Sequence, residues 1–213
     1  MQVSAEIRWF WRSEPPDGLR DWFCGAHAQR FGAGGGESRR DVYLRDAGQV
    51  ELGVKYRGKK KGVEVKGLVA NGAGDLDVSP FVGGVEIWAK WTSESLRLPD
   101  DHTLTTEKRR WLRKFDTGDS RPREIELGGD EMPLNRQAQL PARGCNVELT
   151  RVTLLDTDEI WWTLGFESFG GLPTVVEDLR VVAKEMASRK PPDLEGGHLA
   201  SYPAWLAERI EAS

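Results

Sequence analysis

The chain has 213 residues, of which 30 are basic and 34 acidic, and its net charge at pH 7 is −4. This balance argues against a protein that coats nucleic acid as a bulk polyanion. The two cysteines, Cys24 and Cys145, form no CxxC pair and no Cys/His cluster, which argues against a disulfide framework and a structural zinc site. No basic leader with an apolar run and no stretch of about 18 apolar residues occurs, so we expect a single soluble, cytoplasmic domain over residues 1–213 without a membrane partner.

Most of the chain consists of short segments in which apolar and charged residues alternate, separated by Gly, Pro, Asn and Asp. This pattern is typical of an antiparallel sheet or barrel. Residues 32–40 are predicted to form a loop, and residues 118–135 a connection with one short strand at 125–127. Eight strands are enough to close a barrel with a small interior. The predicted strands lie at residues 5–11, 40–46, 50–57, 62–69, 84–92, 104–116, 144–155 and 159–170.

Helical periodicity appears mainly near the end of the chain. From Thr174 to Pro191, apolar residues recur at three- and four-residue spacing. A second short helix is predicted at 203–210, with proline in its first turn, and another at 15–26. Strands first and helices last favour an α+β fold. The predicted fold class is therefore an eight-stranded antiparallel β-barrel, enclosing a tunnel, with helices packed outside.

Charged side chains gather on one face of strand after strand. Read with period two, the segment 50–67 places five charged residues on one face and Leu52, Val54 and Tyr56 on the other. A solvated sheet face does not require such a concentration of charge on most strands, so we expect these faces to point into the barrel. The charged residues that share a face within their strands are Glu6 with Arg8, Glu51 with Lys55 and Arg57, Glu64 with Lys66, Glu86 with Lys90, Lys108 with Arg110 and Lys114, and Glu148 with its polar neighbours.

A closed interior of this composition predicts a ligand. Acidic and basic groups buried together are costly unless a ligand or ion neutralises them. Carboxylates select hard cations such as Mg²⁺ or Mn²⁺, while Lys and Arg bind phosphate oxygens. We therefore expect a small phosphorylated molecule, and no nucleic acid, as the partner.

In order and spacing, these segments resemble the CYTH superfamily of triphosphate tunnel metalloenzymes. The resemblance spans residues 4–206. It implies an eight-stranded antiparallel barrel whose charged tunnel binds a triphosphate and divalent metal ions. The matching segments are, in chain order, EIRWFW, RRDVYLRD, LGVKYRG, GVEVKG, EIWAKW, EKRRWLRKF, NVELTR, GFESFG and SYPAWL.

The resemblance also implies roles for single residues. Either Glu64 or Glu86 would position the attacking water, and the choice stays open. The metal, Mg²⁺ or Mn²⁺, would be held by Glu6, Glu148 and Glu167. Phosphate binding is implied for Lys55, Arg57, Lys66, Lys108 and Arg110, and Arg8 and Lys90 complete the basic set on the same faces. The chain departs from the family pattern at three places: Arg8 replaces the second acid of the opening ExExK motif, Phe10 its lysine, and Phe169 a second acid of the last strand.

Three functions are consistent with these observations. The first is a metal-dependent hydrolase of inorganic or organic triphosphate, in which the metal orients phosphates and water while basic groups stabilise the transferred charge. The second is a non-catalytic protein of the same barrel that binds a nucleotide or polyphosphate after losing metal ligands. The third is a lipocalin-like barrel for an apolar ligand, with charged faces outward. An outward face gives no reason for Arg and Lys on consecutive strands, which disfavours the third.

Overall fold

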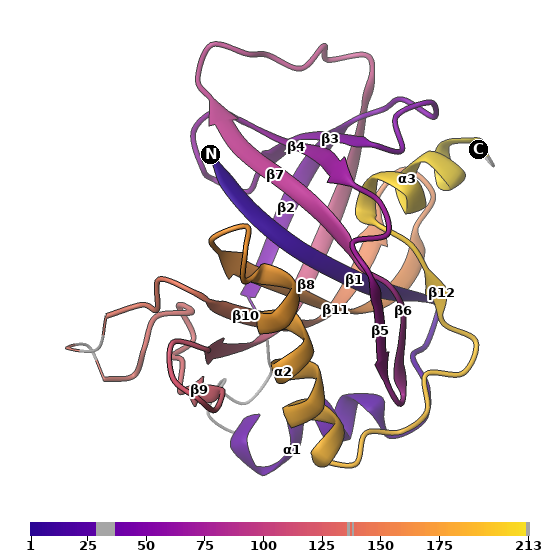
Figure 1. The fold of residues 1–213 in the computed structure, drawn as a ribbon. Coiled ribbons are helices and arrows are strands. Elements are labelled where there is room, and N and C mark those ends of the chain that lie inside the picture. Colours follow the sequence, from indigo (N-terminus) through magenta and orange to yellow (C-terminus); the bar gives the residue numbers. More distant parts are fainter. Residues whose placement is uncertain (29–36, 136, 138, 212–213) are drawn as a thin grey trace.

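The computed structural model describes residues 1–28, 37–135, 137 and 139–211. In this part of the chain, eight antiparallel strands close into a barrel with three helices outside it (Figure 1). Around the barrel the order is β1, β7, β4, β3, β2, β8, β10 and β11, and β11 pairs with β1 to close the ring. These strands are β1 Gln2–Arg12, β2 Glu37–Leu44, β3 Leu52–Arg57, β4 Val63–Ala70, β7 Glu86–Ser93, β8 Thr103–Asp116, β10 Gly144–Leu154 and β11 Glu159–Gly170.

The predicted antiparallel barrel with helices outside and all eight predicted strands are confirmed, with ends that shift by a few residues, but the interior is closed at one end and is not an open tunnel. The prediction of a loop at 32–40 is wrong for its last residues, because β2 already begins at Glu37. Residues 32–36 lie outside the described part of the chain. The short strand expected at 125–127 is β9, Arg123–Ile125. Three further strands were not predicted, because runs of two to four residues are too short to show alternation. They are β5 Asp75–Val78, β6 Phe81–Gly84 and β12 His198–Leu199.

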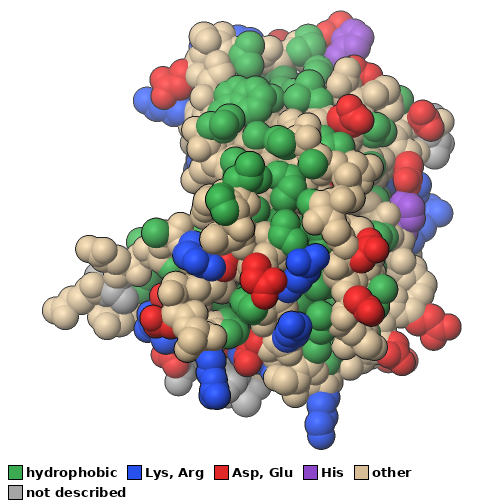
Figure 2. Space-filling view, viewed as in Figure 1, with side chains coloured by type: hydrophobic (Ala, Val, Ile, Leu, Met, Phe, Trp, Pro, Cys, Tyr) green, Lys and Arg blue, Asp and Glu red, His purple; other side chains and the backbone are tan. Residues whose placement is uncertain are grey.

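The long helix α2, Val175–Ser188, covers the outer face of β1, β10 and β11 (Figure 1). It begins after Thr174 and ends at Ser188, shortly before Pro191 and Pro192, which cannot continue it. Its apolar stripe, which includes Leu179 and Val182, packs on the outward side chains of the barrel and on α1, Leu19–Ala28. Charged side chains of both signs gather on the lower half of this face, where α2 lies (Figure 2). None of the described helices is both long and apolar enough to cross a membrane.

The third helix, α3 (Tyr202–Glu211), closes one end of the barrel. There a second apolar cluster joins inward side chains of five strands to the helix. Phe10 stacks on Trp205 of α3, with ring centroids 4.8 Å apart and an interplanar angle of 8°. Gly53 of β3 allows Pro203 to approach, since a Cβ on this glycine would lie 3.1 Å from the proline ring. The barrel interior is therefore a pocket whose floor is α3.

Candidate functional site

The charged strand faces point inward and surround one cavity. It holds about 670 Å³ of empty space, including the part that opens to solvent. Eleven of the twelve candidate residues line it: Glu6, Arg8, Lys55, Arg57, Glu64, Lys66, Lys90, Lys108, Arg110, Glu148 and Glu167. Glu51, predicted on the same face, is exposed before β3 begins and does not line it.

The twelfth candidate, Glu86, lies in a neighbouring hollow. It is directly opposite Glu6 on the adjacent strand, but its carboxylate accepts a hydrogen bond from Trp88 Nε1 at 2.9 Å. Burial raises the pKa of Glu86. Of the two residues considered for positioning water, Glu64 alone lines the main cavity.

A chain of alternating charges lies along the cavity wall. Arg8 Nη2 donates to Glu148 at 3.0 Å, and Arg110 Nη1 donates to the other oxygen of the same carboxylate at 2.8 Å. Arg110 Nε also donates to Glu131 at 2.9 Å, from the connection between β9 and β10. Burial favours the neutral form of Glu148, but the two arginines outweigh burial and lower its pKa well below the ordinary value. Glu148 is thus a fixed anion shared between two cations.

A second cluster surrounds Asp41, which is fully buried on β2. Its carboxylate contacts Arg39 Nε at 3.1 Å, Lys55 Nζ at 3.3 Å and Lys108 Nζ at 3.8 Å. Burial opposes its charge, but these cations outweigh burial and lower the pKa of Asp41. Lys108 also donates to Tyr43 at 2.7 Å, and burial together with Lys55 lowers its own pKa strongly. An additional negative charge beside Lys108 would therefore favour its protonated form.

Two further carboxylates are held by single lysines. Lys66 Nζ donates to Glu6 at 2.5 Å, and Lys90 Nζ donates to Glu167 at 2.8 Å. Glu167 raises the pKa of Lys90, and despite burial Lys90 lowers that of Glu167 to about 2. Glu64 is shared more loosely, at 3.4 Å from Lys55 and 3.5 Å from Arg57.

The acids expected to bind a metal do not form a ligand set in this arrangement. Glu6, Glu148 and Glu167 each contact a Lys or Arg nitrogen within 3.0 Å. Across the described residues, no group of three or more His, Cys, Asp or Glu side chains is placed to hold one ion. A Mg²⁺ or Mn²⁺ ion would have to displace these cations.

Basic groups outnumber acidic groups around the cavity. Among the described residues, eight Lys and Arg side chains line it against four carboxylates. Two acids outside this set, the fully buried Asp41 beside Lys55 and Glu131 beside Arg110, neutralise two more of the cations. Burying the remaining excess of positive charge is unfavourable unless an anion neutralises it, because the interior screens charge less than water does. The site is therefore suited electrostatically to an anion.

Several lining residues were not predicted. Arg39 was assigned to the loop before β2, although its spacing of two from Asp41 and Tyr43 gives all three the same face. Tyr202 and Pro203 come from α3, and no strand pattern could place them in the barrel. Past Arg39, the cavity borders a surface hollow that contains Lys59 and Lys60, both exposed as expected for a solvated turn.

Comparison of the sequence with models of known protein families and with curated proteins found no match to either. The resemblance to the CYTH superfamily therefore rests on the order and spacing of the quoted segments. The barrel agrees with it, but a barrel does not identify that family.

Proposed function

We propose that the barrel interior binds the phosphate chain of a small phosphorylated molecule, such as an inorganic or organic triphosphate. The observation that carries this proposal is the excess of Lys and Arg over carboxylates in one cavity. These cations come from six different strands, so an extended anion can contact several of them at once. Charge-assisted hydrogen bonds to phosphate oxygens are short and about twice as strong as neutral ones.

Hydrolysis dependent on a divalent metal is the second candidate. It is favoured by one observation: Glu6 and Glu167 lie directly opposite each other on neighbouring strands. Against it, each carboxylate already holds a lysine, and breaking two such pairs would leave two buried cations to be neutralised. We therefore favour phosphate binding over metal-dependent hydrolysis as the function.

The test is calorimetric titration with inorganic triphosphate and ATP, with phosphate release measured in parallel in the presence of Mg²⁺ or Mn²⁺. Arg57→Gln removes one cation at the mouth, where the side chain is 22% exposed and its loss is tolerable for folding. Lys61→Gln, in the exposed turn of the same hairpin, is the matched control. We expect binding that weakens with salt and weakens about tenfold in Arg57→Gln, as for loss of one charged hydrogen bond, but stays unchanged in Lys61→Gln.

Other outcomes separate the remaining functions. Metal-dependent phosphate release by the native protein would establish the hydrolase. Failure to bind either triphosphate would refute the proposal. The lipocalin-like alternative required the charged faces to point outward, whereas these side chains line the cavity.

A further inference from the structure

We infer that Arg8 is a built-in cation at the centre of the phosphate site, so that phosphate binding in this barrel needs no divalent metal. The inference rests on the proposed function and specifies how the site neutralises its ligand. It follows from how Arg8 is held, from the space made for it, and from what the surrounding acids already bind.

Arg8 is fixed from several sides. Its side chain is 6% exposed, with Nη2 donating to Glu148 on β10 at 3.0 Å and Nη1 donating to Thr163 on β11 at 3.2 Å. Its guanidinium carbon lies 4.9 Å from the ring centroid of Tyr202 on α3. Burial opposes the charge, but Glu148 and other neighbours outweigh burial and raise the pKa of Arg8. Its position and charge are therefore set before any ligand arrives.

The barrel wall is shaped around this guanidinium. Gly165 lies directly opposite Arg8 in the register of β1 and β11. A Cβ on Gly165 would lie 2.5 Å from Arg8 Cζ and less than 3 Å from both terminal nitrogens, closer than real Cβ contacts. The absence of a side chain at Gly165 lets Arg8 reach across its strand to Glu148, two strands away. Arg8 and Gly165 thus form a matched pair.

The neighbouring acids already form ion pairs with Lys and Arg side chains of the cavity wall. Glu148 binds Arg8 and Arg110 with its two oxygens, and Glu6 and Glu167 bind lysines. A divalent ion placed among them would meet Arg8 as a like charge in a poorly screened interior. The two hydrogen bonds of Arg8 use two of the five N–H donors of a guanidinium. A phosphate oxygen can therefore accept hydrogen bonds from the remaining donors of Arg8 without displacing Glu148.

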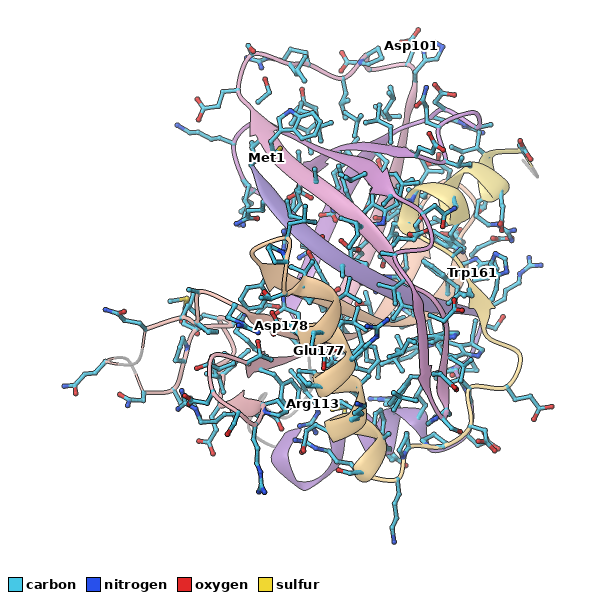
Figure 3. The ribbon with its side chains drawn as sticks, viewed as in Figure 1. Met1, Asp101, Arg113, Trp161, Glu177 and Asp178 are labelled. Atoms are coloured by element: carbon cyan, nitrogen blue, oxygen red, sulfur yellow. The ribbon has the colours of Figure 1, made fainter. Side chains whose placement is uncertain are left out.

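The test is calorimetric titration of the full chain with inorganic triphosphate, once in buffer with EDTA and once with Mg²⁺. The variants are Arg8→Gln, which removes the charge, and Arg8→Lys, which keeps the charge but loses the planar fork. Arg113→Gln is the matched control. Arg113 is equally buried on β8 but donates to the carbonyl of Phe23 and to Glu124, beside α1 and α2 and outside the cavity (Figure 3).

We expect the native protein to bind triphosphate at least as tightly in EDTA as in Mg²⁺, since Mg²⁺ also binds the free ligand. In EDTA, Arg8→Gln should weaken binding about tenfold to a hundredfold, Arg8→Lys less, and Arg113→Gln not at all. Thermal melting of each variant checks that it is folded. If Arg8→Gln does not fold, the comparison of Arg8→Lys with the native protein decides.

Binding that occurs with Mg²⁺ and disappears in EDTA would overturn the inference while leaving the proposed function intact. An affinity in EDTA that both Arg8 variants leave unchanged would also overturn it. Failure of the native protein to bind triphosphate in either buffer would refute the proposed function itself, and with it this inference.

Discussion

The fit of Arg8 against Gly165 predicts a large and specific effect of a single methyl group. In Gly165→Ala the new Cβ would lie 2.5 Å from Arg8 Cζ, so the guanidinium has to leave its place. Overpacking of a well-packed interior costs about 1–3 kcal/mol. For a chain of this size, each kcal/mol shifts the melting temperature by about 2–4 °C, which gives a loss of about 2–12 °C. Chemical and thermal unfolding measure both quantities.

The specificity of the effect is tested by a double-mutant cycle. In an Arg8→Ala background the methyl group meets open space, so Gly165→Ala should cost less than about 0.5 kcal/mol there. Gly84→Ala is the control for adding a methyl to a strand glycine, because a Cβ at Gly84 has no described atom within 4 Å. Equal destabilisation by Gly165→Ala in the native and Arg8→Ala backgrounds would refute the argument that these two residues are matched.

Three further predictions concern charge. Glu131→Gln removes a carboxylate that competes with phosphate for Arg110, so triphosphate affinity should rise several-fold, and an unchanged or lower affinity in titration would contradict this. Because burial lowers the pKa of Lys108, triphosphate binding should be accompanied by proton uptake at pH values where this lysine is neutral before the ligand binds. Titrations in buffers of different ionisation enthalpy measure this uptake, and uptake that persists undiminished in Lys108→Arg would rule this lysine out as its source. The pKa of Glu167 is lowered from 4.5 to about 2, so its contribution to stability is complete above pH 4.5 and is lost as pH falls toward 2. The free energy of unfolding of Glu167→Gln should therefore fall less over this pH window than that of the native protein.

The barrel could be predicted from the sequence because its strands are long and alternate clearly. In a closed barrel the period of two fixes which side chains point inward, and this placed Lys55, Lys66 and Glu148 in the cavity. The partners of these side chains could not be predicted, because they depend on the register of strands that are distant in the chain. Lys66 and Glu6 are 60 residues apart, and no local pattern links them.

Elements outside the strand pattern also escaped prediction. The floor of the pocket is formed by α3. Its helical period predicts which side of the helix is apolar, but it does not predict that this side covers the end of the barrel. Glu131 reaches Arg110 from a turn in a long connection, where its backbone has a φ of 61°. Such contacts follow from the tertiary fold and cannot be predicted from sequence periodicity.

The floor formed by α3 has a consequence for which part of a ligand is recognised. A molecule that enters past Arg39 and Arg57 ends against Tyr202 and Pro203, so its leading end is enclosed and its trailing end remains near the surface. If the proposed function is right, selection would act on the terminal group of the ligand and much less on the body attached behind it. Compounds that share the same charged end but carry different bodies would therefore compete for this one pocket.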